Sequence, residues 1–211
     1  LNDINLDLMS NQKMFRLLQG DVGSGKTIVA LTAANNVVKS GFQVAVMAPT
    51  EILAKQHYKL ANKIFKKNLN IEILSSKSNY KVKKTITKKL SEHKIDIIFG
   101  THAIFQSKVI FKKLGLIIID EQHKFGVNQR KKLSDKGGDN CDVLLMSATP
   151  IPRTLTMTIY GDMDLSIIRE KPKSRKPTKT YSKLESKIDD ILRFIKNEIK
   201  NDNQIFWVCP L

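Results

Sequence analysis

Residues 20–27, which read GDVGSGKT, constrain the fold of this chain more than any other stretch. They match the pattern G-x-x-x-x-G-K-[ST], a loop whose glycines let consecutive backbone N–H groups turn inward around phosphates. Such a loop needs a strand before it and a helix after it. Residues 14–19 predict the strand, and the apolar, alanine-rich residues 28–38 predict the helix. A glycine turn that binds nothing is the alternative, but these flanking elements favour a nucleoside triphosphate site.

Each position of this loop has an expected role in holding the triphosphate. Lys26 is expected to reach the β- and γ-phosphates, and the Thr27 hydroxyl is expected to ligate Mg²⁺. The positive N-terminal end of the following helix adds to the attraction for phosphate. The predicted nucleotide-binding residues are Gly20, Asp21, Val22, Gly23, Ser24, Gly25, Lys26 and Thr27.

A pair of acidic residues forms the second candidate motif. Asp120 and Glu121 directly follow residues 114–119, the most apolar predicted strand. In phosphate-loop enzymes an aspartate at such a strand end holds Mg²⁺, usually through water, and the neighbouring glutamate takes a proton from the attacking water. The alternative is that both carboxylates merely cap the next helix. We expect Glu121, Lys26 and Asp120 to form the catalytic set.

The alternation of short apolar stretches with longer amphipathic ones predicts the fold class. It is typical of βαβ units and therefore of an α/β fold with a doubly wound, mostly parallel sheet. The predicted strands are residues 14–19, 43–48, 71–75, 95–100, 114–119 and 142–146, and the predicted helices are residues 28–38, 52–67, 80–92 and 185–200. Ligands gather at the carboxyl ends of strands in such sheets. We expect five residues to share that edge, namely Gln19, Ala48, Gly100, Asp120 and Ser147.

Polar residues at two of these strand ends are candidates for coupling the site to movement. Gln122 and His123 follow the acidic pair, and the hydroxyls of Ser147 and Thr149 follow the strand at 142–146. A histidine beside the catalytic base is expected to relay the nucleotide state to another site, and the two hydroxyls are expected to bond to it or to the carboxylates. A buried structural histidine and an ordinary turn are the alternatives.

Two other strand ends carry candidate contacts for nucleic acid. Residues 49–51 and 100–102 each present a hydroxyl and backbone amides, which can hold the phosphates of a nucleic-acid backbone. Capping of the next helix explains the same residues nearly as well, so both interpretations stay open. The candidate DNA-binding residues are Pro49, Thr50, Gly100, Thr101 and His102.

The charge of the chain favours a polyanionic partner. Lysine and arginine number 36 against 20 aspartate and glutamate residues, a formal net charge of +16. Only six of these cations are arginine, and a coding bias toward lysine, asparagine and isoleucine is an alternative source of part of the excess. The lysine-rich helix predicted at 80–92 is either a face that follows phosphates or an ordinary solvated face.

Other reactive side chains give no sign of a second active site. Cys141 and Cys209 lie far apart and outside any C-x-x-C spacing, so we expect buried structural thiols in a reducing compartment. His57 and His93 are single residues on predicted helices, and we expect each to be structural or exposed. The sequence shows no zinc-ligand spacing, and no apolar stretch approaches the ~20 residues of a membrane helix.

Six motifs occur together and in order along the chain. They are GDVGSGKT, APTEILAKQH, GTHAIFQ, IIIDEQHKFGVNQR, MSATPIPRTL and YGDMDLSII. This combination resembles the first motor lobe of superfamily 2 helicases, and specifically the RecG family of bacterial ATP-dependent DNA helicases. The resemblance covers nearly the whole chain. The closely similar transcription-repair coupling translocases are the nearest alternative, but they typically carry Phe at the position of Ser24 and Glu at that of Gln122.

The resemblance implies a RecA-like phosphate-loop NTPase fold, with ATP and Mg²⁺ as cofactors and duplex or branched DNA as the partner. Its implied activity is fork regression and branch migration in recombination and repair. By matching positions, residues 20–27 would bind ATP, Thr27 and Asp120 would hold Mg²⁺, and Glu121 would activate water. The residues that would couple hydrolysis to movement are Gln122, His123, Ser147 and Thr149. The implied protein is a bacterial monomer of the cytoplasm, associated with the nucleoid.

Composition and resemblance together predict the domain organisation. Residues 171–179 contain two prolines, five cations and no apolar residue, which is typical of an exposed linker. We expect residues 1–170 to form the ATP-binding lobe, residues 171–180 to form the linker, and residues 181–211 to begin the second lobe with a strand at 204–209. We therefore expect a piece of a longer protein without the family's wedge domain or the lobe that supplies the arginine finger. Such a piece alone is expected to hydrolyse ATP at a negligible rate.

Two functions from other classes stay as alternatives. A non-motor phosphate-loop enzyme, such as a small-molecule kinase, would need a lid and an acceptor site, for which the sequence offers no candidate. A nucleic-acid-binding module with a vestigial ATP site is the other alternative. The intact set of Lys26, Thr27, Asp120 and Glu121 argues against it.

Overall fold

The computed structural model describes most of the 211-residue chain in seven stretches. The described residues are 1–66, 68–75, 77–106, 108–121, 141–149, 163–170 and 178–209. The chain divides into two compact units, Leu1–Lys173 and Ser174–Leu211. The candidate site motifs all lie in the first unit.

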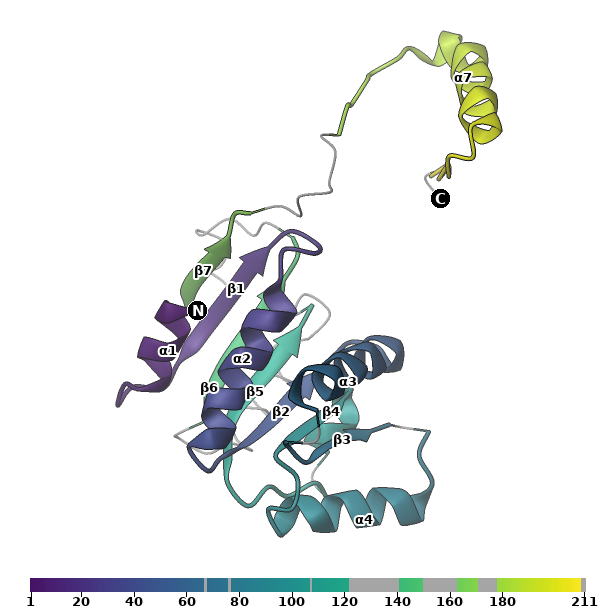
Figure 1. Cartoon of the computed structure of the whole chain (residues 1–211). Helices are drawn as coiled ribbons and strands as arrows, with labels where there is room; N and C mark the ends of the chain where they lie inside the picture. The colour runs from purple at the N-terminus through teal and green to yellow at the C-terminus, as the bar shows by residue number, and fades with distance from the viewer. Residues whose placement is uncertain are drawn as a thin grey trace. The chain divides into compact units, whose positions relative to one another are not determined.

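A seven-stranded sheet forms the centre of the first unit (Figure 1). Its strands lie in the order β3-β4-β2-β5-β6-β1-β7, and every neighbouring pair is parallel. The strands are β1 (Phe15–Gly20), β2 (Gln43–Met47), β3 (Ile71–Leu74), β4 (Ile97–Gly100), β5 (Leu114–Asp120), β6 (Asp142–Ser147) and β7 (Asp164–Ile168). The predicted parallel α/β fold is confirmed.

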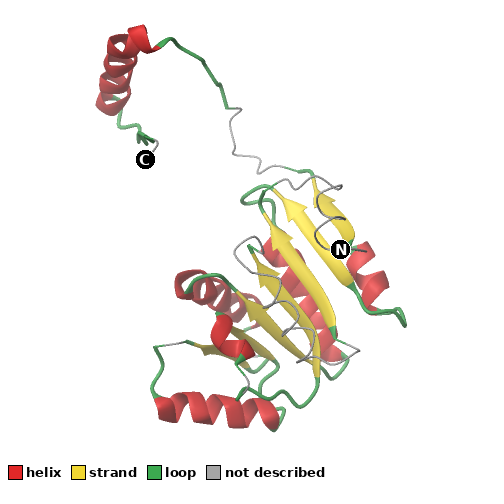
Figure 2. Ribbon diagram, turned by 180° about the vertical axis from the view of Figure 1, so that it is seen from behind, coloured by secondary structure: helices red, strands yellow, loops and turns green. Residues whose placement is uncertain are grey.

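Helices pack on both faces of this sheet, and Figure 2 shows the unit from the side opposite to Figure 1. Apolar residues of α1, α2 and α3 join one buried cluster, and those of α4 and the short 3-10 helix η1 join a second cluster. The helices are α1 (Asn2–Leu8), α2 (Lys26–Lys39), α3 (Glu51–Phe65), α4 (Tyr80–Ser91) and η1 (His102–Phe105). The sheet is therefore covered on both sides, as a doubly wound fold requires.

The two clusters explain why the central strands read as continuous apolar runs. Successive strand residues point to opposite faces. On β5, Leu116 and Ile118 belong to the cluster with α2, whereas Ile117 and Ile119 belong to the cluster with α4. All four side chains are buried. A strand with helices on both sides needs apolar residues at every position.

The structure differs from the sequence prediction at two places toward the C-terminal end of the chain. No strand is expected from the sequence at 164–168, but β7 lies there as an edge strand beside β1. Its burial alternates, with Ser166 buried and Ile167 half exposed, so it lacks the apolar run of the central strands. The strand predicted at 204–209 is wrong, because this segment has no strand structure. A strand needs a hydrogen-bonded neighbour, and the described part of the second unit offers helices instead.

The second unit contains the predicted helix at 185–200, which comprises a 3-10 turn, η3 (Glu185–Lys187), and α7 (Ile188–Lys200). Apolar residues of α7 such as Leu192 and Phe194 are exposed within this unit. Among the described residues, no helix is both long and apolar enough to cross a membrane.

Candidate nucleotide-binding site

The carboxyl ends of the parallel strands bring the predicted site residues to one edge of the sheet. Gln19 on β1 is in register with Ser147 on β6. Asp120 ends β5, which lies between β2 and β6. Beyond the end of β2, the Ala48 N–H donates to the Gly100 carbonyl at 2.9 Å. The five strand ends therefore line the same edge, with the phosphate loop and the acidic pair two strands apart.

The backbone of the phosphate loop adopts a shape that requires glycine. Gly23 and Gly25 have φ angles of 79° and 95°, in the left-handed region that side chains with a Cβ disfavour. Gly25 is the N-cap residue of α2 and has no side chain with which to cap the helix. The N–H groups of the first helical turn are therefore available to an anion, which is the usual basis of phosphate binding at helix N-termini.

Two polar side chains lie inside this loop. The Lys26 ammonium folds back and donates to the Gly20 carbonyl at 2.7 Å and to the Asp21 carbonyl at 3.0 Å. The Ser24 Oγ atom is buried and has no hydrogen-bond partner among the described residues. A buried hydroxyl without a partner costs about 1–3 kcal/mol. A phosphate oxygen at the loop would give the Ser24 hydroxyl an acceptor, so the loop fits a phosphate ligand.

The acidic pair has a fixed carboxylate and an unusual backbone. The Asp120 side chain is largely buried, and its Oδ1 atom accepts from the Glu121 N–H at 3.0 Å. Glu121 has a φ angle of 51°, which is uncommon for a residue with a Cβ and costs roughly 1–2 kcal/mol. Such strained residues concentrate at functional sites. The strained backbone of Glu121 is therefore in keeping with a functional role for this residue.

The second oxygen of Asp120 is bonded to a residue that we expected to be only structural or exposed. His57 on α3 lies with its Nε2 atom 2.7 Å from Asp120 Oδ2, and both side chains are largely buried. The helical period held one signal for this burial, because His57 shares the inward face of α3 with Ala54 and Ala61. Nothing in the sequence links it to Asp120, which lies 63 residues away.

The turn after β6 is tied to the strand that leads into the phosphate loop. The Ser147 and Thr149 hydroxyls lie 2.9 Å apart, and the Gln19 amide donates to the Thr149 carbonyl at 2.9 Å. Because Gln19 directly precedes the phosphate loop, a shift of this turn would displace the residue next to the loop. Gln122 and His123 lie outside the described residues, as does the expected bond between these hydroxyls and His123.

The first candidate DNA segment has a structural role in α3. The Thr50 Oγ1 atom accepts from the Leu53 N–H at 3.3 Å, so Thr50 caps the helix. Glu51, the first residue of α3, accepts from the Ser75 hydroxyl at 2.8 Å. Thr50 is exposed and Pro49 is half-buried. Capping and an accessible surface thus coexist here, and the DNA contact stays a prediction.

The second candidate DNA segment follows β4. Gly100 is buried so closely that a Cβ there would lie 2.5 Å from the Leu74 carbonyl oxygen. Thr101 is half-buried, and its carbonyl accepts from the Ile104 N–H at 3.1 Å at the start of η1. His102 is exposed. Glycine is therefore required at this strand end for packing, whatever the neighbouring residues bind.

The two cysteines differ from each other. Cys141 is buried, and burial raises the pKa of its thiol to about 12. The prediction that Cys209 is also buried is wrong for this chain, because it is exposed in the second unit. Among the described residues, no group of three or more His, Cys, Asp and Glu side chains could hold a metal ion.

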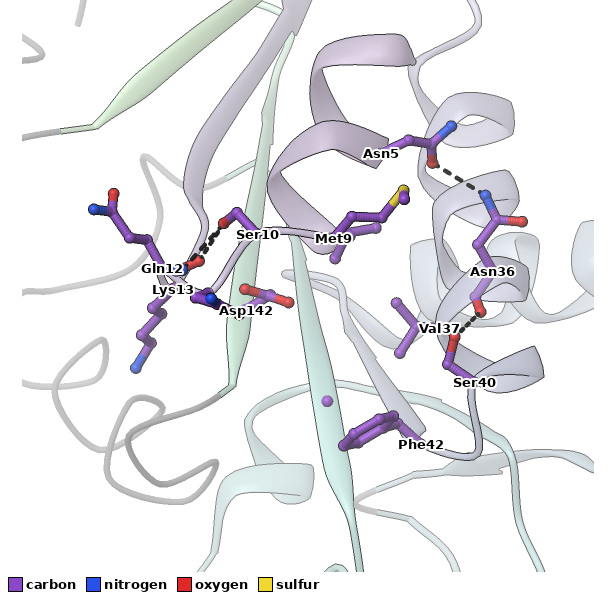
Figure 3. A pocket seen from close by; sticks show the side chains of 13 residues that line it. Asn5, Met9, Ser10, Gln12, Lys13, Asn36, Val37, Ser40, Phe42 and Asp142 are labelled. Carbon is purple, nitrogen blue, oxygen red and sulfur yellow. Dashed lines mark hydrogen bonds between the residues drawn. The ribbon is translucent and has the colours of Figure 1, made fainter.

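A cavity of about 650 Å³ lies away from the phosphate loop, near the start of β6 (Figure 3). Asn5 of α1 and Asn36 of α2 bridge it with an amide hydrogen bond of 3.0 Å, and Asp142 and Phe42 also line it. The strands begin at this side of the sheet, so the cavity is separate from the nucleotide-binding edge.

Known proteins resemble this chain along its whole length. ATP-dependent DNA helicase RecG of Bacillus subtilis (strain 168) is 49% identical over 212 residues, which cover 100% of this chain and 31% of the relative. The RecG of Aquifex aeolicus (strain VF5) is also 49% identical, over 100% of this chain and 27% of the relative. A solved structure of RecG bound to a three-way DNA junction is 40% identical with a TM-score of 0.83, and the match covers 100% of this chain and 28% of that one.

This chain thus spans less than a third of the length of these relatives. The predicted similarity to RecG helicases is confirmed, and so is the RecA-like fold. Residues 5–158, most of the chain, match the family model described as DEAD/DEAH box helicase. The chain belongs to the DEAD/DEAH box helicase family.

Proposed function

We propose that this chain is the ATP-binding motor lobe of an ATP-dependent DNA helicase that acts on branched DNA. The observation that carries the proposal is the shared sheet edge, where a phosphate loop and an acidic pair lie two strands apart. Similarity to RecG along the whole chain supports the helicase assignment, and the relative bound to a three-way junction supports branched DNA. The net charge of +16 is consistent with a nucleic-acid partner.

The chemistry follows from the residues at that edge. Lys26 balances charge on the β- and γ-phosphates, while the open N–H groups of α2 and the Ser24 hydroxyl bond to phosphate oxygens. Thr27 and Asp120 provide hard oxygen ligands of the kind Mg²⁺ takes. When bound, Mg²⁺ neutralises charge on the transferring phosphate. Glu121 takes a proton from the attacking water.

The remaining predicted residues are assigned to coupling and to DNA. The bond from Gln19 to the turn that holds Ser147 and Thr149 supports a link between this turn and the phosphate loop. Gln122 and His123 complete the coupling set by resemblance. DNA is proposed to bind at the exposed residues beyond β2 and β4, with Thr50 and His102 among them.

The domain assignment belongs to the same proposal. Residues 1–170 form the ATP-binding lobe, residues 171–180 the linker, and residues 181–211 the start of a second motor lobe. The division of the chain between Lys173 and Ser174 supports this assignment. The proposed protein acts as a monomer in the bacterial cytoplasm, at the nucleoid.

The test compares two active-site variants of the complete protein in which this chain occurs. Lys26→Ala should weaken nucleotide binding, because the ammonium that faces the phosphates is gone. Glu121→Gln should retain nucleotide binding but lower the hydrolysis rate roughly 10²–10⁴-fold, the usual effect of losing a general base. ATP hydrolysis, nucleotide affinity and unwinding of a three-way junction are measured for each.

Lys39→Ala is the matched control, because Lys39 is an exposed lysine in the last turn of the same helix. It should leave all three measurements unchanged. Unwinding that survives both Lys26→Ala and Glu121→Gln would rule out a motor driven by this site.

A further inference from the structure

His57 joins α3 to the acidic pair through a single short bond. Its Nε2 atom donates to Asp120 Oδ2 over 2.7 Å, and the two side chains are 10% and 12% exposed. The other Asp120 oxygen accepts the Glu121 N–H at 3.0 Å. Among the described residues, each carboxylate oxygen therefore has one donor, and the plane of the carboxylate is held from two sides.

This arrangement matters because a carboxylate that holds a metal needs a defined orientation. Groups that hydrogen-bond to a metal-ligating side chain commonly change metal affinity or activity ~10–100-fold when they are removed. The Glu121 N–H comes from a strained turn with a φ angle of 51°. His57, in contrast, comes from the middle of a 15-residue helix packed on the sheet. His57 is thus held by a packed helix, whereas the other donor belongs to a turn.

The packing of α3 explains how His57 is held in place. Ala54 and Ala61 lie one turn before and after it on the same buried face, and both are at most 2% exposed. Such small residues let the helix approach the sheet closely. The next residue, Tyr58, packs edge-on against Phe99 of β4, with ring centroids 6.3 Å apart. The packing of α3 on the sheet thus fixes the position of the imidazole.

We propose that His57 is a positioning residue that orients the Asp120 carboxylate for the metal–nucleotide complex. The inference rests on the proposed function, since it assigns the metal role to Asp120. His57 does not touch nucleotide or metal in this role. It acts by holding the carboxylate, so its replacement should change metal affinity more than the affinity for the nucleotide alone.

The test uses two replacements that differ in reach. In His57→Gln the side-chain amide reaches about as far as Nε2 and can still donate to Asp120. In His57→Asn the same amide is one methylene shorter and cannot. The affinity for Mn²⁺ in the presence of saturating ADP is measured by electron paramagnetic resonance on the complete protein in which this chain occurs, with the unsubstituted protein as the parent chain, and thermal unfolding is recorded in parallel.

We expect His57→Asn to weaken Mn²⁺ binding about 10-fold or more, and His57→Gln to restore most of that loss. Affinity for ADP without metal should stay near that of the parent chain in both. Tyr58→Leu is the matched control, because it disturbs the packing of α3 on β4 without removing the bond to Asp120. It should lower Mn²⁺ affinity much less than His57→Asn does. If His57→Asn does not fold, His57→Leu takes its place against His57→Gln.

Equal Mn²⁺ affinity in the parent chain, His57→Asn and His57→Gln would overturn the proposal. So would an equal loss in His57→Asn, His57→Gln and Tyr58→Leu, which would show that only the packing of α3 matters. If the parent chain itself binds no Mn²⁺–ADP, the failure lies with the proposed nucleotide site. A parent chain that binds normally while the His57 variants match it leaves the helicase proposal intact.

Discussion

Asp142, the first residue of β6, is a carboxyl group that folding makes harder to ionise. Burial raises its pKa above the ordinary value, although the Met14 N–H, which donates to Oδ1 at 2.8 Å, acts in the opposite direction. A raised pKa in the folded state means that this carboxyl favours folding most when it is protonated. That contribution is present below about pH 4 and is lost as the pH rises through the raised pKa.

Asp142→Asn should therefore stabilise the chain at pH 7, because asparagine keeps an oxygen acceptor for Met14 and carries no charge. The gain over the parent chain should shrink as the pH falls toward 4, where Asp142 itself becomes neutral. Free energies of unfolding from urea titrations at several pH values measure the difference. A gain that stays constant with pH would contradict the argument.

Glu92→Gln is a control of opposite sign. A hydrogen bond from the Lys94 ammonium, whose Nζ atom lies 2.7 Å from Oε2, lowers the pKa of Glu92. Its contribution is present at neutral pH and lost as the pH falls through the lowered pKa. Replacing Glu92 should thus destabilise the chain at neutral pH, and only slightly, since the pair is solvent-exposed.

At the scale of single residues, the sequence predicts best those residues whose role depends on their immediate neighbours in the chain. The left-handed φ angle of Gly25 agrees with the glycine that the loop motif requires at this position. His57 could not be predicted in the same way, because its partner Asp120 is 63 residues away and meets it only in the folded sheet. Cys209 is exposed in the second unit, which no local pattern reveals.

At the scale of elements, α3 combines a capped N-terminus with a candidate DNA contact, and Thr50 can separate the two. Thr50→Ala removes the oxygen that accepts the Leu53 N–H and should cost about 1 kcal/mol of stability. Thr50→Asp keeps an N-cap of comparable quality. It also adds a negative charge, so a phosphate at this point should bind roughly fivefold more weakly, as about 1 kcal/mol of repulsion implies.

Thermal unfolding and the affinity of the complete protein for a three-way junction measure the two effects. Ser10→Asp adds the same charge at an exposed residue near the opposite edge of the sheet and should leave DNA affinity unchanged. If Thr50→Asp binds the junction as well as the parent does, Thr50 is a helix cap and nothing more.

The sequence predicts two kinds of element best. One is a helix whose apolar residues recur with a clear helical period, and the other is a strand that is buried on both faces and therefore forms a continuous apolar run. β5 and β6 are examples, because their central residues are buried on both faces of the sheet and therefore have to be apolar. β7 is not predicted, since an edge strand needs apolar residues on only part of its surface. Residues 204–209 show the opposite error, since a strand is predicted there and none forms. This apolar run has no neighbouring strand to pair with in the described part of the chain.

At the scale of the whole molecule, the sheet order turns scattered motifs into one site. The phosphate loop follows β1, whereas the acidic pair follows β5, and β6 lies between the two strands. The alternation of strands and helices predicts a parallel sheet and therefore a shared edge, but it does not predict which strands are neighbours. That order is set by packing of the helices across both faces, which involves contacts between residues far apart in the chain.

The organisation of the whole molecule also determines whether this chain can hydrolyse ATP on its own. All the residues that are proposed to bind phosphate and activate water lie in its first unit, whereas the resemblance assigns the arginine finger to a second motor lobe. Such a finger contributes ~10³–10⁵ in rate. We therefore expect the 211-residue chain to bind nucleotide weakly and to hydrolyse ATP at least about 10³-fold more slowly than the complete protein. Single-turnover hydrolysis with and without branched DNA measures this, and a chain that reaches the DNA-stimulated rate of the complete protein would show that no second lobe is needed.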